Sequence, residues 1–256
     1  MTAFVAVIPE QVKVGMGSKT FLKMSVSMSA NFLRKRDKNT VATVDEVIRA
    51  RRTEKILAND NFDWQPSKED LSTGDRAVES ALDVARWAPF HYPRDLQQQV
   101  EPWTVRWLRR DACLTFASKM PEWHGQLAAG HKFPKLFRAC GSCVIVSWLP
   151  NTEMHPEKKR LQVNEEHLAA TAAFVQNFLI ALEARNLGSY WASGPVVLEG
   201  GIPDRLGLQD KEKVTAVVFV HYRGSTPDVG LDRLEGKLRK SRDPEMGWLK
   251  AVEFGE

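Results

Sequence analysis

The sequence predicts a large domain that combines helices with β-strands. A long apolar stretch between Asn164 and Gly188 is typical of a core helix. Segments 142–149 and 214–222 are rich in β-branched residues, as strands are. The chain has 256 residues, of which 43% are hydrophobic, so it can bury a sizeable core. This length fits one large domain or two small ones.

Basic residues are concentrated at the N-terminus. Residues 1–40 hold seven basic and two acidic side chains, a formal charge of +5, whereas the whole chain carries +4. The remainder is slightly acidic, which argues against nucleic-acid binding. This basic arm lacks the apolar core of a secretory signal. It is compatible with an organelle transit peptide, a disordered arm or a coding start placed too early.

Neither a membrane span nor a disulfide framework is expected. The long apolar stretch is interrupted by Gln176 and Asn177, and three cysteines are too few for a framework, so a reducing, cytoplasmic location is predicted. Cys140 and Cys143 have the spacing of a redox pair or half a zinc site. They lead into a strand rather than a helix, and a zinc site needs two further ligands. We therefore expect buried structural thiols and no metal site.

The first helix is expected to start at Thr43, where Thr43 and Glu46 form a capping-box pattern. It leads into a cluster of cations and one hydroxyl. The cluster has two interpretations: solvated charges that interact with the helix dipole, or an anion site in which paired arginines bind phosphate. The residues concerned are Arg49, Arg51, Arg52, Thr53 and Lys55.

The middle of the chain predicts a loop over 59–71 and a helix from Ser72 or Thr73 to Ala85. Alternating large apolar residues predict a strand over 102–108. Residues 111–138 read as one or two helices, which either pack in the ordinary way or form the wall of a pocket. Breaks are expected at Pro121, Gly125, Gly130 and Pro134.

The long helix is expected to begin at Asn164, after a charged loop over 151–163, and to end near Gly188. It is apolar all round, so we expect it to be buried all round. An aromatic turn over 189–195 should follow, then a turn with a short helix over 199–207. The strand 214–222 leads into a connection over 224–236 and a second basic cluster with Lys240 and Arg242.

Taken together, these segments resemble the nitroreductase family of FMN-dependent oxidoreductases over roughly residues 41–245. The resemblance depends on four motifs in the family's order and not on any single one. They are Arg51-Arg52-Thr53, Ala88-Pro89 with Glu101-Pro102-Trp103, Asn186-Leu187-Gly188-Ser189-Tyr190-Trp191, and Lys240-Ser241-Arg242.

The resemblance implies a fold, a cofactor and a set of contacts. The fold would be an α+β three-layer sandwich with a mixed or antiparallel sheet and a long central helix, in one domain over 41–256 and in an intertwined homodimer. FMN would bind at the dimer interface, and NAD(P)H would be the co-substrate. The implied cofactor-binding residues are Arg51, Arg52, Thr53, Lys55, Trp191, Ser193, Gly194, Lys240 and Arg242, with Lys55 as the catalytic cation near the flavin pyrimidine edge.

The sequence departs from the family pattern between residues 88 and 103. Phe90 replaces a small hydroxyl residue, and Pro93–Gln97 replaces the stretch that usually carries a flavin-contacting Asn. His91 or Arg94 is the candidate to replace that Asn. Pro195 also removes a backbone donor just after Gly194.

Three functions follow from these observations. The first is an FMN-dependent NAD(P)H oxidoreductase that acts on a nitroaromatic, a quinone or a similar small electrophile. The second is a specialised flavin enzyme of the same family, either a reductive dehalogenase or a flavin-fragmenting enzyme. The third is a non-catalytic flavin-binding protein. The sequence specifies neither the electron acceptor nor a preference between NADH and NADPH.

Overall fold

The structure, a computed structural model, describes residues 38–94, 99–154, 156–234 and 252. The predictions for residues 1–37, Lys240 and Arg242 lie outside these residues. Contacts along the chain divide it between Glu46 and Val47, and the following description concerns residues from Val47 onward, apart from the bounds of the first helix. The single domain expected over 41–256 stays a prediction.

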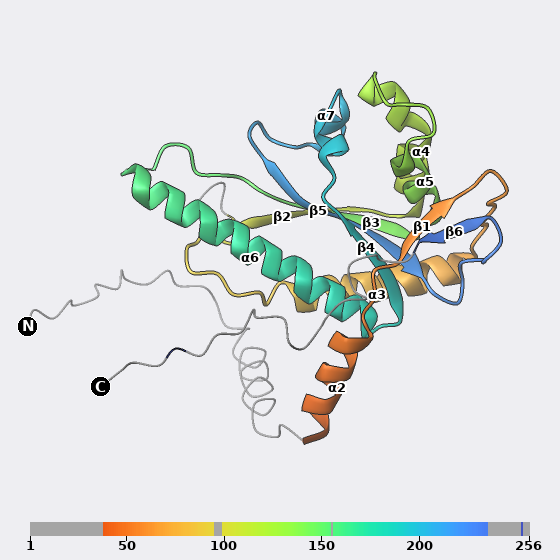
Figure 1. Cartoon of the computed structure of the whole chain (residues 1–256), viewed down its shortest axis with the longest axis horizontal. Helices are drawn as coiled ribbons and strands as arrows, with labels where there is room; N and C mark the ends of the chain where they lie inside the picture. The colour runs from red at the N-terminus through yellow and green to blue at the C-terminus, as the bar shows by residue number, and fades with distance from the viewer. Residues whose placement is uncertain (1–37, 95–98, 155, 235–251, 253–256) are drawn as a thin grey trace, which may run out of the picture. The chain divides into compact units, whose positions relative to one another are not determined.

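A four-stranded antiparallel sheet lies at the centre of the described residues, in the order β2-β3-β5-β4 (Figure 1). The two middle strands are buried over most or all of their length, which explains their continuous apolar runs. These strands and that over 102–108 were predicted correctly. Their bounds are β2 Trp103–Leu108, β3 Ser142–Trp148, β4 Leu187–Ala192 and β5 Lys213–Tyr222.

Successive residues of the middle strands face two different hydrophobic cores. Val144 and Val218 pack with α3 and α6, whereas Ile145 and Phe219 pack with α4 and α5 on the opposite face. The alternation of side chains along a strand produces this division. Figure 1 shows the helix pairs on either side of the sheet, which confirms the three-layer α+β sandwich. The helices are α3 Lys68–Ala85, α4 Arg110–His124, α5 Lys132–Ala139 and α6 Glu157–Glu183.

A second, two-stranded antiparallel sheet pairs β1 (Lys55–Ala58) with β6 (Leu231–Leu234). Neither strand was predicted, and the expectation of a plain connection over 224–236 was wrong at β6. Just before β1, Thr53 forms a parallel bridge with Ser189 of β4. The cationic segment is therefore attached to the edge of the main sheet.

The predicted starts of the first two helices were wrong. Helix α2 spans Lys38–Ala50, so Thr43 lies inside it and not at its start. Helix α3 begins at the N-cap Ser67, whose hydroxyl accepts from the Asp70 backbone N–H at 3.0 Å, while the Asp70 carboxylate accepts from the Ser67 N–H at 3.3 Å. Only one apolar residue, Leu71, lies in the first turn, so the apolar period does not reveal this start.

The 111–138 segment forms two helices, α4 and α5, which break between Gly125 and Gly130. Both glycines have φ of 76°, a conformation that favours glycine. The breaks expected at Pro121 and Pro134 were wrong, because both prolines lie inside helices. Pro134 is in a first turn, where no backbone N–H is needed. Further along, the 3-10 helix η1 (Pro195–Leu198) precedes α7 (Ile202–Leu206), the predicted short helix.

The central helix differs from the prediction at both ends. It begins at Glu157, so the loop expected over 151–163 and the N-cap at Asn164 were wrong. Charged residues form this first part, and Arg160 pairs with Glu157 at 3.0 Å, which favours a helix without an apolar period. The helix ends at Glu183, and Asn186, with φ of 57°, leads into β4. Gly188 is therefore a strand residue, and the turn expected over 189–195 was wrong for its first four residues, which belong to β4.

We expected helix α6 to be buried on every side, but in the single chain it is not. Leu161 and Leu168, one heptad apart on the helix, are 54% and 45% exposed. No helix in the described part of the chain is long and apolar enough to cross a membrane. Cys140 and Cys143 are buried and unbridged, as predicted, and Cys113 is buried and unbridged as well; burial raises the pKa of Cys113 and Cys143.

Candidate functional site

A cleft of about 590 Å³ lies where the cationic segment meets α6 and the ends of β4 and β5. It brings together four residues predicted from the sequence: Arg51, Thr53, Trp191 and Ser193. The structure adds residues that sequence reasoning did not select. Gln176 had a usable signal, because it interrupts an otherwise apolar helix. The lining, here called the main cleft, consists of Arg51, Thr53, Gln176, Leu179, Ser189, Tyr190, Trp191, Ala192, Ser193 and Thr215.

The segment Arg51–Lys55 is held along β4 by backbone contacts. The Glu54 N–H donates to the Ser189 carbonyl oxygen at 2.9 Å, beside the Thr53–Ser189 bridge. Thr53 lines the main cleft. Lys55 is not a lining residue, but its Nζ lies 6.0 Å from the centroid of the Tyr190 ring. The predicted catalytic cation therefore lies one side chain away from the main cleft.

Two aromatic residues of β4 form one wall of the main cleft. The Tyr190 ring stacks on Phe219 of the core, with centroids 6.2 Å apart, and burial raises the pKa of Tyr190. The Trp191 indole donates to the Thr215 carbonyl oxygen at 3.1 Å, yet the residue stays 38% exposed. Its orientation is thus fixed while part of its ring remains accessible.

Gly194 ends this wall and redirects the chain into η1. Its φ is 66°, and a Cβ atom here would overlap the side chain of Val217. Only glycine satisfies both the backbone conformation and this close approach. Gly194 is buried and does not line the main cleft, whereas its neighbour Ser193 does.

Arg52 points its guanidinium at the end of α2. Its Nη1 donates to the carbonyl oxygens of Ala50 at 3.0 Å and Arg51 at 3.1 Å, and it also contacts the carbonyl of Arg49. These carbonyls belong to the negative end of the helix dipole, so the contacts fit the structural interpretation of the cation cluster. A phosphate contact by Arg52 stays a prediction.

The loop Phe90–Arg94 carries the two candidates for the missing Asn, and neither lines the main cleft. His91 is exposed. Arg94 is only 3% exposed and donates from Nη1 to Gln99 Oε1 and Thr104 Oγ1, both at 3.1 Å. Burial lowers its pKa. Arg94 thus interacts with its own neighbourhood, and a cofactor role for either residue stays a prediction.

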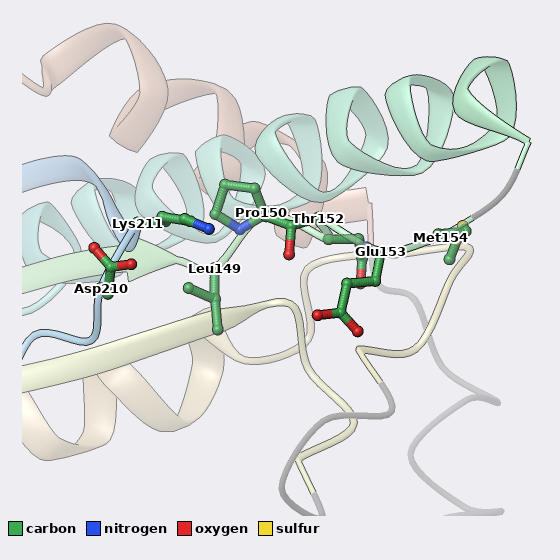
Figure 2. Close-up of a pocket in the computed structure, with 8 residues that line it drawn as sticks. Leu149, Pro150, Thr152, Glu153, Met154, Asp210 and Lys211 are labelled. Carbon is green, nitrogen blue, oxygen red and sulfur yellow. The ribbon is translucent and has the colours of Figure 1, made fainter.

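A second cleft, of about 360 Å³, contains none of the predicted site residues (Figure 2). It lies between the β3–α6 connection and the turn before β5. Figure 2 shows the Lys211 side chain extending toward Pro150. Its lining places one cation, Lys211, with two carboxylates, Glu153 and Asp210, whereas the lining of the main cleft has one cation and no carboxylate, so the second cleft suits an anion less well. The lining is Leu149, Pro150, Asn151, Thr152, Glu153, Met154, Asp210 and Lys211.

A buried ion pair stabilises the sheet away from the main cleft. Arg106 Nη1 lies 2.7 Å from Glu212 Oε1, and the two side chains are 17% and 1% exposed. The Ser147 hydroxyl also donates to Glu212. Burial opposes ionisation of Glu212, but hydrogen bonds from Arg106, Ser147 and the Gln209 backbone hold its pKa below the usual value. Over the described residues, no group of three or more His, Cys, Asp or Glu side chains is placed to hold a metal ion.

The α+β sandwich with a polar, aromatic-walled cleft at a strand end defines a class of protein, and the comparison with known families identifies it. The model of the nitroreductase family matches residues 68–222. The chain belongs to the nitroreductase family. A protein of Bacillus subtilis strain 168, YfhC, named as an NAD(P)H nitroreductase, is 26% identical over 73 residues, which cover 28% of this chain and 38% of that relative.

Two solved structures share the fold. A nitroreductase-like family protein of Bacillus cereus superposes with a TM-score of 0.56 at 20% identity, covering 82% of this chain and 96% of the other. A protein of Desulfovibrio desulfuricans, described as a nitroreductase and solved with FMN, has a TM-score of 0.51 at 18% identity, covering 83% and 98%. At these identities the likeness establishes the fold.

Proposed function

We propose that this protein is an FMN-dependent oxidoreductase, which takes electrons from NADH or NADPH and passes them to a small electrophile such as a nitroaromatic or a quinone. The observation that carries the proposal is the main cleft, which combines Arg51, four Ser or Thr residues and an accessible indole in a chain of the nitroreductase family. The FMN bound to the Desulfovibrio protein and the name of the Bacillus relative support the choice of cofactor and co-substrate.

The lining of the main cleft fits the chemistry of FMN. A guanidinium matches a phosphate, hydroxyl and amide groups match the ribityl chain, and an aromatic face matches the ring system. A volume of about 590 Å³ is in the range of small-molecule sites. In this proposal Arg51 and Thr53 bind the phosphate and ribityl chain, with Arg52, Lys240 and Arg242 as further phosphate contacts. Trp191, Ser193 and Gly194 lie at the ring.

FMN, when bound, supplies hydride chemistry that no side chain can perform. The chain's own contribution is binding, orientation and charge. Lys55 is proposed as the cation that stabilises negative charge at the pyrimidine edge. Neither a protein nucleophile nor a general base is required for that role.

A homodimer is part of the proposal. Leu161 and Leu168 form an exposed apolar stripe on α6, and large exposed side chains on one helix face are typical of a subunit interface. Light scattering on the eluting protein should give twice the chain mass of 28.9 kDa. A monomer at micromolar concentration would refute the dimer, but it would not contradict the cofactor assignment.

An anaerobic absorbance titration tests the activity. The purified protein should show a flavin band near about 450 nm that bleaches with NADH or NADPH and returns when a quinone or nitroaromatic is added. A colourless protein that takes up no added FMN would refute the proposal.

One observation favours a specialised flavin enzyme of the family as the second candidate. Of the described residues between 88 and 103, none lines the main cleft, and Arg94 is engaged elsewhere. If the protein binds flavin but neither NADH nor NADPH bleaches the flavin band, the result would favour this candidate or a non-catalytic flavin-binding protein.

A further inference from the structure

We infer that Arg223 is a positioning residue for the main cleft: with Glu54 and Glu183 it forms a triad that fixes the Arg51–Lys55 segment against β4. The inference deepens the proposed function, on which its cofactor part rests. Arg223 directly follows β5, Glu183 ends α6, and Glu54 precedes β1. The triad therefore ties β5 and α6, which both contribute residues to the main cleft, to the segment that carries Thr53.

The contacts of the triad are numerous and partly buried. Arg223 Nε donates to Glu54 Oε1 at 2.9 Å, and Nη2 contacts the same oxygen. Nη1 and Nη2 donate to the two Glu183 oxygens at 3.3 and 3.0 Å. The side chains of Arg223, Glu54 and Glu183 are 27%, 21% and 15% exposed. Burial opposes the guanidinium charge, yet the two carboxylates raise the pKa of Arg223. A bidentate arrangement of this kind restrains both partners.

The segment is extended at this point, so successive side chains point to opposite sides. Glu54 points to Arg223, whereas Thr53 lines the main cleft and Lys55 lies over Tyr190. The Glu54 contact on one side thereby sets the position of the two proposed cofactor contacts on the other. This division explains a glutamate in the middle of a segment that is proposed to bind an anion.

Gly188 provides independent evidence that the Glu54 carboxylate has a defined place. A Cβ atom at this position would overlap that carboxylate, and no other group is so close to it. Gly188 has an ordinary strand conformation, because its φ is not positive. Glycine at this position therefore leaves space for the Glu54 carboxylate and is not required by the backbone conformation.

The triad also balances charge near the proposed phosphate site. Removal of Arg223 would leave two carboxylates behind Thr53, which would repel an anion as well as release the segment. A test must separate these effects. Gly188→Ala displaces the Glu54 carboxylate without changing any charge, and Arg223→Lys keeps the charge but loses the bidentate geometry.

The experiment measures FMN affinity of the full chain in four variants by equilibrium titration. Arg223→Met and Gly188→Ala should each weaken FMN binding on the order of tenfold or more, since small displacements of binding groups have effects of this size. Arg223→Lys should recover part of the loss. Arg106→Met is the matched control, because it breaks the more buried Arg106–Glu212 pair. It should lower the melting temperature at least as much as Arg223→Met does and leave FMN affinity within about twofold of the wild type.

Wild-type affinity in both Arg223→Met and Gly188→Ala would overturn the inference. So would an equal loss of affinity in Arg106→Met, because the effect would then reflect general stability. Amide hydrogen exchange of Glu54 in the protein without cofactor separates this outcome from failure of the proposed function. If the wild type binds no FMN, faster exchange in the two variants than in Arg106→Met still supports the triad, and unchanged exchange refutes it.

Discussion

Two arginine-bearing segments beside α6, Arg51–Lys55 and the loop Phe90–Arg94, use their charges in opposite ways. In the first, Arg51 and Thr53 line the main cleft while Glu54 is held from behind by Arg223. In the second, Arg94 is buried against Thr104 and Gln99. The Tyr92 carbonyl oxygen lies 3.0 Å from His167 Nε2 of α6, which attaches the loop to the helix.

The role of a cation near a candidate site therefore depends on the groups that it contacts and not on its position in the chain. Both segments contain Arg, a hydroxyl or imidazole neighbour and a short loop. Arg51 lines the main cleft, whereas Arg94 is buried and is not part of its lining. Substitutions of Arg51 and Arg94 test this contrast directly, and His221, two residues before Arg223, should give an effect of intermediate size.

The largest effect is expected for Arg51→Ala. Loss of a guanidinium from a partly desolvated phosphate site should cost about 2–5 kcal/mol of FMN binding free energy. Arg52→Ala is the matched comparison, because Arg52 donates to the carbonyls that end α2 and should cost less. Equilibrium titration with FMN measures both. An Arg51→Ala protein that retains wild-type affinity would remove the phosphate assignment.

The second effect concerns pH. His221 lies in β5 opposite Gly188, and its burial lowers its pKa to about 4, with smaller opposing and reinforcing contributions from the Ala139 backbone and from Arg233 and Arg223. The unfolded chain binds this proton near pH 6.5, so the free energy of unfolding should fall as pH drops from about 6.5 to about 4, by about 3 kcal/mol in total.

Urea unfolding across this pH range checks the second prediction. His221→Leu should flatten the pH dependence, whereas His91→Leu, in the exposed part of the other segment, should leave it unchanged. An identical pH dependence in His221→Leu and the wild type would show that other groups cause the acid sensitivity. Glu212, whose pKa is lowered from 4.5, adds to the loss of stability from about pH 4.5 downward, where the unfolded chain takes up this proton before the folded chain does.

The smallest effect is expected for Arg94→Met. The variant loses two hydrogen bonds from a charged group, which destabilises the fold. It also removes the unfavourable burial of a cation, so the free energy of unfolding should fall by only about 1–2 kcal/mol. FMN affinity should stay within about twofold of the wild type. A large loss of FMN with little loss of stability would instead assign Arg94 to the cofactor, and would make the two segments alike.

The sequence predicts the parts of the fold that carry a strong local pattern. Strands β2, β3 and β5 are evident from alternating or continuous apolar residues, because each is at least half-buried by the layers around it. Strand β4 was missed because Gly188 and Ser189 suggest a turn, and only pairing with β5 makes this segment extended. Strand β1 has four residues, too few for a period to be recognised.

The candidate site divides in the same way. Arg51, Thr53, Trp191 and Ser193 could be selected from motifs, and the structure brings them to one cleft. The burial of Arg94 could not be foreseen, because it depends on Thr104 in a strand ten residues later. Arg223 was not selected either, since its two carboxylate partners are far apart in sequence. Motif spacing reveals side chains that share a local segment, whereas long-range partners need the fold.

The missing side chain at position 188 restricts the order in which this protein can change. Any residue larger than glycine there meets the Glu54 carboxylate, so such a replacement displaces this carboxylate from Arg223 unless position 54 has already become shorter. A shortened residue at 54 gives up the contact with Arg223, which leaves Glu183 as its partner. The mutational path that avoids this overlap therefore runs from 54 to 188. A library that varies both sites at once should favour pairs in which a larger residue at 188 is combined with a shorter one at 54.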